Sequence, residues 1–192
     1  MQLQHVNLKL LVKNPEQVDL ESLIPVFHSW IQDQPFEELL LDVADYRHVH
    51  EGPGVVLIGH EGDYSVDNTG RHLGVRYNRK AALNGENSDR LQQAARAALM
   101  ACQRLEADSR LSGKLRFNGQ EIVLFINDRL LAPNSEATRE ESQADFDTFF
   151  HKLFRGCQYS VSYGSDSRRL FSVSVKASHS FAVADLLANL DS

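Results

Sequence analysis

The sequence predicts a single α+β domain, residues 1–192, whose mainly antiparallel sheet of about seven strands is covered on one face by two long helices. Three observations carry this prediction. Apolar residues recur at helical spacing through residues 88–107, alternation marks residues 157–176 as a β-hairpin, and the chain is 42% hydrophobic and 24% charged. A chain of this length and composition can bury one sizeable core without metal or disulfide help.

The first part of the chain predicts a strand, a helix and a hairpin. Residues 6–13 are apolar enough for a strand, which ends where an Asn-Pro pair follows. Helical spacing of apolar residues then predicts a helix after Ser22, its candidate N-cap, with Trp30 in the core. Two strands at residues 39–50 and 55–61 flank a Gly-Pro-Gly turn, and the second is apolar on both faces, as expected of a central strand.

A second hairpin and the longest helix follow. Residues 64–66 and 73–79 are joined by an Asp-Asn-Thr-Gly sequence in which Asn and Gly tolerate positive φ. Residues 88–107 predict one uninterrupted helix with Ser88 as N-cap and Asp89 at the positive end of the helix dipole. Its core stripe is expected to consist of Leu91, Ala94, Ala95, Ala98, Leu99, Cys102 and Leu105.

The last third of the chain predicts a strand, a helix, a hairpin and a short helix. The strand covers residues 121–127 and the helix covers residues 136–154. Residues 157–163 and 170–176 alternate apolar residues with serines, which predicts a hairpin with one face on the core and a serine-lined face in water. A helix over residues 181–190 completes the prediction.

Both halves of the chain run strand, helix, strand, strand and helix, an order compatible with a duplication of about residues 5–110 and 115–192. In that interpretation His28 and His151 occupy the same point of matching apolar helices, and the hairpin of residues 64–79 is an insertion in the first half. The alternative is a chance similarity between short apolar segments.

The charge of the chain argues against a protein built chiefly to bind nucleic acid. Twenty Lys and Arg residues against 26 Asp and Glu residues give a net charge of -6. These charges are unevenly distributed, because residues 71–116 hold ten basic and four acidic residues, or +6, which leaves -12 for the rest. The segregation favours an electrostatically complementary homo-oligomer, most simply a dimer.

Several other classes of protein and site are disfavoured. Cys102 and Cys157 form no C-x-x-C motif, so neither a zinc knuckle nor a redox motif is indicated, and Cys102 is expected to be a buried thiol. No secretory leader pattern and no 18-residue apolar run is visible, so a soluble cytoplasmic protein that does not enter a membrane is expected. Phosphate-loop, dinucleotide-binding and nucleophile-elbow motifs are missing as well.

One face of the first hairpin gathers side chains that suit a metal. Imidazole and carboxylate groups bind zinc, iron or nickel, and histidines two residues apart on a strand point to the same side. In a hairpin closed by a two- or four-residue loop, even positions of the first strand pair with odd positions of the second. That register gathers the expected metal ligands His48, His50, Glu61 and Asp63 with the expected proton carriers Tyr46 and Asp42.

The register of this hairpin decides between that site and its alternatives. A three-residue loop would instead bring His60 round to His48. A polar sheet face in water would explain the same residues with no site at all.

Two classes of function therefore follow from the sequence. The first is a non-catalytic cytoplasmic binding or interaction protein, homo-oligomeric and of unknown ligand, because the site candidates are few and the charge is segregated. The alternative is a metal-dependent enzyme of the hydrolase or oxygenase type, which would use the His and carboxylate cluster in residues 42–63 with a divalent transition metal as cofactor.

Overall fold

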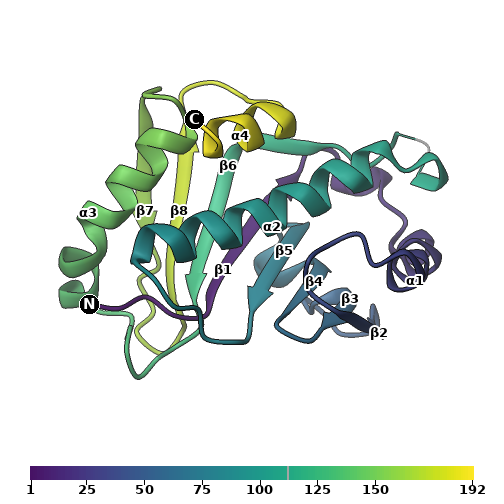
Figure 1. Ribbon diagram of the computed structural model, residues 1–192, viewed down its shortest axis with the longest axis horizontal. Helices are drawn as coiled ribbons and strands as arrows, with labels where there is room; N and C mark the ends of the chain where they lie inside the picture. Colours follow the sequence, from purple (N-terminus) through teal and green to yellow (C-terminus); the bar gives the residue numbers. More distant parts are fainter. Residues whose placement is uncertain (112) are drawn as a thin grey trace.

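An eight-stranded antiparallel sheet organises the protein in the computed structural model, which describes residues 1–111 and 113–192 (Figure 1). The strand order is β2-β3-β4-β5-β1-β6-β8-β7. The predicted α+β class, with a mainly antiparallel sheet packed against helices, is confirmed. The strands are β1 (Val6–Val12), β2 (Leu40–Tyr46), β3 (Gly54–Gly59), β4 (Gly62–Asp67), β5 (Gly74–Arg79), β6 (Phe117–Ile126), β7 (Tyr159–Tyr163) and β8 (Phe171–Ala177).

The α-helices lie mainly on one face of this sheet. Helix α2 crosses β1 and β5, α4 packs on α2 and β6, and α3 packs on α2 and α4 (Figure 1). Helix α1 lies apart from these three, against β2. The α-helices are α1 (Leu23–Asp33), α2 (Asn87–Ala107), α3 (Glu136–Leu153) and α4 (Val183–Leu190), and short 3₁₀ helices occur at Pro15–Gln17, Leu20–Ser22, Thr69–Arg71 and Ser109–Leu111. Within the described ranges, none of the helices combines the length and apolarity that a membrane span requires.

The apolar stripe of α2 lies in the core, as predicted. Its residues Leu91, Ala95, Leu99, Cys102 and Leu105 are at most 1% exposed. They meet the side chains of alternate β1 residues, because successive side chains of a strand point to opposite faces. The helix begins one residue earlier than predicted, so Ser88 is not its N-cap.

The last hairpin has the predicted alternation. Strands β7 and β8 pair Val161 with Val175 and Ser162 with Ser174, so the apolar residues share one face and the serines share the other. Val175 is fully buried, whereas Val161 is 36% exposed. The difference arises because β7 is an edge strand of the sheet, with β8 as its one neighbour.

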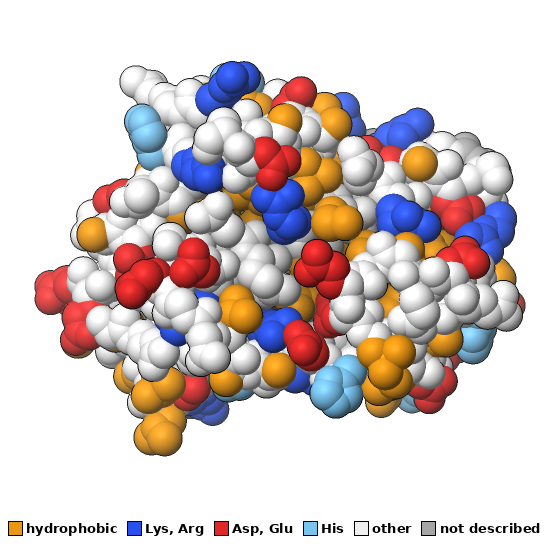
Figure 2. Space-filling model, in the orientation of Figure 1, with side chains coloured by type: hydrophobic (Ala, Val, Ile, Leu, Met, Phe, Trp, Pro, Cys, Tyr) orange, Lys and Arg blue, Asp and Glu red, His pale blue; other side chains and the backbone are white. Residues whose placement is uncertain are grey.

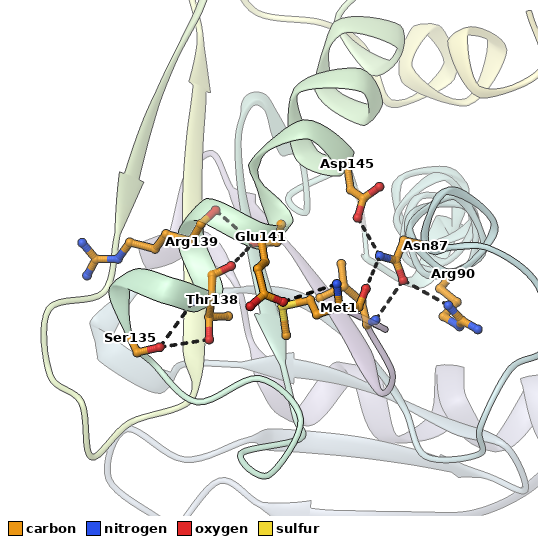
Figure 3. Close-up of polar contacts among 10 residues, drawn as sticks. Met1, Asn87, Arg90, Ser135, Thr138, Arg139, Glu141 and Asp145 are labelled. Atoms are coloured by element: carbon orange, nitrogen blue, oxygen red, sulfur yellow. Dashed lines mark hydrogen bonds and ion pairs between the residues drawn. The ribbon is translucent and has the colours of Figure 1, made fainter.

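The first residue of α2 joins the N-terminal segment to α3 (Figure 3). The Asn87 side chain accepts hydrogen bonds from the Leu3 amide at 2.8 Å and from Arg90 Nη1 at 3.0 Å. It donates to the Met1 carbonyl oxygen at 2.9 Å and to Asp145 Oδ2 at 2.6 Å. One side chain therefore holds the N-terminal segment, α2 and α3 together.

The strand order changes the predicted half-repeat. Strands β6, β8 and β7 follow one another in the sheet as β1, β5 and β4 do, on the two sides of the central β1–β6 pair. The hairpin β7–β8 thus matches β4–β5, and the extra hairpin of the first half is β2–β3. In this comparison residues 64–79 are not the extra hairpin that was expected. The match of His28 with His151 stays a prediction, and their helices have different neighbours, since α1 packs on β2 whereas α3 packs on α2 and α4.

The folded protein brings basic and acidic side chains together that are separate in the sequence. Most basic side chains of residues 71–90 and Arg96 meet carboxylates from outside the basic segment, so much of the charge separation seen along the sequence is compensated. Figure 2 shows the result on the helix-covered face, where acidic and basic side chains are interspersed with hydrophobic ones. The ion pairs are Arg71 with Glu51, Arg79 with Glu61, Lys80 with Asp63, and Arg96 with Asp191, at 2.6, 2.8, 2.7 and 2.5 Å.

Candidate functional site

The hairpin that carries the predicted metal site has a different register from the expected one. Strands β2 and β3 pair Tyr46 with Gly54, so even positions face even positions. The expectation of a two- or four-residue loop is therefore wrong. Residues 47–53 form two successive turns, closed by hydrogen bonds from the Val49 amide to the Tyr46 carbonyl and from the Gly52 amide to the Val49 carbonyl. These turns take the histidines out of the strand.

The four expected metal ligands lie at opposite ends of the β2–β3 hairpin. His48 and His50 are exposed in the connection before β3, whereas Glu61 and Asp63 follow the far end of β3. A six-residue strand spans roughly 17 Å, and a metal needs its ligand atoms about 2.0–2.2 Å away. Among the residues that the structure describes, no group of three His, Cys, Asp or Glu side chains is arranged to hold a metal ion.

The two expected acidic ligands have other partners. Glu61 Oε2 forms an ion pair with Arg79 Nη1 at 2.8 Å, and Asp63 Oδ1 forms one with Lys80 Nζ at 2.7 Å. Both carboxylates therefore connect the β3–β4 turn to β5 and to the residue after it.

The two expected proton carriers both lie on β2 and are exposed. Asp42 accepts a hydrogen bond from the next amide in the chain, at 2.8 Å. The Tyr46 ring lies 6.5 Å from the His48 ring, centroid to centroid. Asp42 is in register with Ile58, and Ile58 with Asp63, so the two carboxylates are two strands apart, roughly 10 Å.

A cavity of about 440 Å³ lies on the helix-covered side of the sheet, between α2, strands β4 and β5, and the segment that follows α1. This volume is within the range typical of small-molecule sites, roughly 300–1,000 Å³. Its apolar wall consists of Phe36, Leu83, Ala97, Met100 and the ring of Tyr64. Its polar lining consists of Glu37, Glu38, Glu61, Arg79, Gln93 and Arg96.

The segment between α1 and β2 is held in place by its first residue. Gln34 ends α1 in the left-handed conformation, with φ of 45°. Its side-chain amide accepts from the Leu40 amide and donates to the Leu40 carbonyl, both at 2.9 Å, which fastens the two ends of the segment. Phe36 packs between Trp30 and Tyr64, with ring centroids 5.3 and 4.8 Å away. These contacts place Glu38 at the cavity wall.

Glu38 has one satisfied and one unsatisfied carboxyl oxygen. Its Oε1 accepts a hydrogen bond from the Tyr64 hydroxyl at 2.5 Å. Its Oε2 is buried and has no hydrogen-bond partner among the described residues. Burial raises the pKa of the Glu38 carboxyl above its ordinary value, and the hydrogen bond from Tyr64 opposes that rise only in part. Burial therefore favours the neutral form of the Glu38 carboxyl group more than water does.

Two tyrosines form the floor beneath this carboxyl group. Tyr64 and Tyr77 are paired directly across β4 and β5, with ring centroids 5.0 Å apart. The Tyr77 hydroxyl accepts a hydrogen bond from Gln93 Nε2 of α2 at 3.0 Å. A Cβ atom on Gly62 would lie 2.6 Å from that hydroxyl oxygen, so only glycine lets the Tyr77 ring lie against the β3–β4 turn.

Sequence reasoning did not single out Glu38, Tyr64 or Tyr77 as site residues. Glu38 follows a helix in a segment without periodicity, and the two tyrosines read as ordinary strand residues. One signal was available, because the predicted hairpin of residues 64–66 and 73–79 can place Tyr64 opposite Tyr77.

The other face of the sheet carries a buried ion pair that is not a site of the same kind. Lys9 Nζ lies 2.5 Å from Asp67 Oδ1, and both side chains are 2% exposed. Asp67 also accepts hydrogen bonds from the amide and the hydroxyl of Thr69, at 3.1 and 2.9 Å. Its oxygens are thus already engaged, which indicates a structural role.

The chain matches no protein-family model, and no curated protein is significantly similar to it in sequence. What the site can do is therefore argued from its chemistry. Apolar walls exclude water from part of an occupant, and an unsatisfied carboxyl oxygen favours an occupant that donates a hydrogen bond.

Proposed function

We propose that the protein is a non-catalytic binding protein that holds a small organic molecule in the cavity between α2 and strands β4 and β5. The observation that carries the proposal is the position of Glu38 at the wall of a cavity of about 440 Å³, with one carboxyl oxygen that has no partner in the described part of the chain. A buried acceptor without a partner costs about 1–3 kcal/mol. A ligand that turns the Glu38 carboxyl group toward the cavity and donates a hydrogen bond to it would offset that cost.

The walls of the cavity favour a ligand with an apolar body. Phe36, from the segment after α1, and Met100, from α2, both line it. Both side chains are partly exposed, so a ligand that covers them would bury apolar surface and gain about 25 cal/mol per Å². Pockets that combine such walls with a few polar groups are typical of small-molecule sites.

The alternative of a metal-dependent enzyme has less support. Its expected ligands His48 and His50 are separated from Glu61 and Asp63 by the length of β3, so a metal would need ligands from other segments. Metal analysis of the purified protein, with melting curves in the presence of Zn²⁺, Mn²⁺, Fe²⁺ or Ni²⁺, tests it independently of the cavity.

The experiment for the proposed function is a fragment screen by ¹H–¹⁵N NMR on the wild-type chain and two matched variants. Ala97→Phe places a ring in the cavity, whereas Ala107→Phe places the same ring at the exposed end of α2. We expect fragments that shift the amides of Phe36, Gln93 and Met100 in the wild type and in Ala107→Phe, with at least about tenfold weaker binding in Ala97→Phe. A screen without such fragments, or fragments equally bound by Ala97→Phe, would contradict the proposal.

We propose the cytoplasm as the compartment and a homodimer as the assembly. The dimer is supported by the two edges of the sheet, β2 and β7, each of which has one strand neighbour in the described sheet. Light scattering coupled to gel filtration measures the mass directly. A dimer gives twice the chain mass of 21.6 kDa, and a mass equal to that of one chain contradicts it.

A further inference from the structure

The charges around the cavity are unevenly compensated. Both cationic side chains that line it already have carboxylate partners, since Arg79 pairs with Glu61 and Arg96 pairs with Asp191. Glu38 lies in no ion pair among the described residues, and its one hydrogen bond comes from the neutral Tyr64 hydroxyl. The cavity-lining groups that lack a counter-charge among the described residues are therefore two acids, Glu38 and Glu37.

Three aromatic rings lie beside Glu38 in a continuous series. Phe36 stacks on Tyr64 with an angle of 20° between the ring planes, and Tyr64 packs on Tyr77 at 52°. Phe36 and Tyr64 both line the cavity, but Tyr64 is 2% exposed and its ring packs against Phe36 and Tyr77. The partly exposed Phe36 is therefore the ring that an occupant can contact. Aromatic rings attract cations through the negative potential of their faces, with a gain of about 0.5–2 kcal/mol that grows as water is excluded.

Anionic and neutral occupants fit this arrangement less well. An anion would meet the unpaired Glu38 and the neighbouring Glu37, while the two arginines are engaged by other carboxylates. A neutral alcohol could donate to Glu38 but would supply no charge to stabilise its ionised form. An ammonium group supplies both the donor and the opposite charge.

We propose that the cavity binds an organic cation, an ammonium group on an apolar or aromatic body, with Glu38 as its counter-charge and Phe36 as its aromatic contact. This inference rests on the proposed function, because it names the class of ligand for the same cavity. It predicts a charge preference that a merely apolar pocket would not have.

Trp30 provides a built-in reporter for the test. It is the single tryptophan of the chain, it is 3% exposed, and its ring packs edge-on against Phe36 at 5.3 Å. Three probes of similar shape differ in charge at pH 7.5: 2-phenylethylammonium, 2-phenylethanol and 3-phenylpropionate. Titrations followed by Trp30 emission and by ¹H–¹⁵N NMR give their affinities on one scale.

We expect the ammonium probe to bind at least about tenfold more tightly than the alcohol, and the carboxylate probe to bind most weakly. Glu38→Gln keeps the shape of the side chain and an acceptor for Tyr64 but removes the charge. It should weaken the ammonium probe at least about tenfold and change the alcohol less than about threefold. Glu16→Gln removes the same charge from an exposed residue outside the cavity and should leave the probe affinities at the wild-type values.

The outcomes separate the two proposals. If the alcohol or the carboxylate binds in the cavity as tightly as the ammonium probe, the cavity is a binding site but not one for cations. The same conclusion follows if Glu38→Gln leaves the ratio of the ammonium and alcohol affinities unchanged. If the three probes and the fragments all fail to shift the residues of the cavity, both proposals are wrong. If Glu16→Gln weakens the binding of the ammonium probe as much as Glu38→Gln does, the preference for cations comes from the overall charge of the protein and the inference is wrong.

Discussion

The hydroxyl group of Tyr64 donates its hydrogen bond to Glu38 Oε1 at 2.5 Å, and thereby joins a strand residue of the sheet to the segment after α1. The two residues are 26 positions apart in the chain. Both residues line the cavity, and the second carboxyl oxygen of Glu38 is buried without a partner among residues 1–111 and 113–192.

Glu38 should make the stability of the protein depend on pH. Its folded-state pKa is raised by burial, so the folded protein holds the proton more tightly than the unfolded chain does. The contribution of this carboxyl group to the free energy of unfolding is greatest below its pKa in the unfolded chain, about 4.3. That contribution is lost as the pH rises through its pKa in the folded protein. We expect Glu38→Gln to raise the melting temperature at pH 8 relative to the wild type by more than it does at pH 4.

The groups that face Glu38 sharpen this test. Glu61 and Asp63 raise its pKa further, whereas Arg79 lowers it. Melting curves between pH 4 and pH 9 measure the difference between variant and wild type. A difference that stays constant over this range would show that Glu38 does not titrate differently in the folded and unfolded states.

Replacing Lys9 should be strongly destabilising. Burial lowers the pKa of Lys9, but its ammonium group is the nearest counter-charge of the buried Asp67 carboxylate. Lys9→Met leaves that carboxylate buried with its hydrogen bonds to Thr69, and removal of one partner of a buried pair typically costs about 3–5 kcal/mol. Urea unfolding measures the loss. Lys13→Met, which changes an exposed lysine, should stay within about 0.5 kcal/mol of the wild type.

Asn87 should contribute more to stability than its partial exposure indicates. Asn87→Ala removes side-chain hydrogen bonds to Leu3, Met1 and Asp145, so we expect a loss of about 2–3 kcal/mol in the free energy of unfolding. The exposed Asn84→Ala serves as the control. Equal unfolding midpoints for the two variants would show that the N-terminal segment is not held through this side chain.

The two cysteines should differ sharply in reactivity. Cys102 is fully buried on α2, and burial raises the pKa of its thiol. Cys157 is partly exposed, with Ser178 Oγ at 3.0 Å and His179 Nδ1 at 3.2 Å, and the hydrogen bond with Ser178 lowers its pKa. Iodoacetamide should label Cys157 alone in the folded protein, because the thiolate is the nucleophile.

Peptide mapping of the labelled protein checks this prediction. Ser178→Ala should slow the labelling of Cys157 severalfold at pH 7.5, and Cys102 should react only after unfolding in urea. Labelling of Cys102 in the folded wild type would place that residue outside the core.

Local patterns in the sequence were sufficient for most elements of the fold. The α2 stripe through Leu91 and Leu99 repeats with the helical period, and the alternation around Val173 and Ser174 repeats with the strand period. Both periods are fixed by backbone geometry within a few residues, so they can be read without knowing what packs against them. The existence, type and buried face of these elements followed from the sequence alone.

Such local patterns could not predict the candidate site. The expected cluster of His48 and Glu61 depended on a register, and the turns of residues 47–53 moved the histidines out of the strand. A register depends on turn geometry and on packing against distant segments, so a one-residue difference reverses which side chains share a face. The meeting of Glu38 with Tyr64 likewise depends on how Gln34 closes the segment after α1.

By itself, the sequence determined the α+β class, the buried faces of α2 and β8, and the burial of Cys102. Only the tertiary structure decided the strand order, the register of β2 and β3, the pairing of basic and acidic segments, and the cavity at Glu38. The physical reason is the range of the interactions involved. Periodicity records how each element faces the core, whereas strand neighbours, ion pairs and cavities join residues far apart in the chain, and these are settled only when the segments pack together.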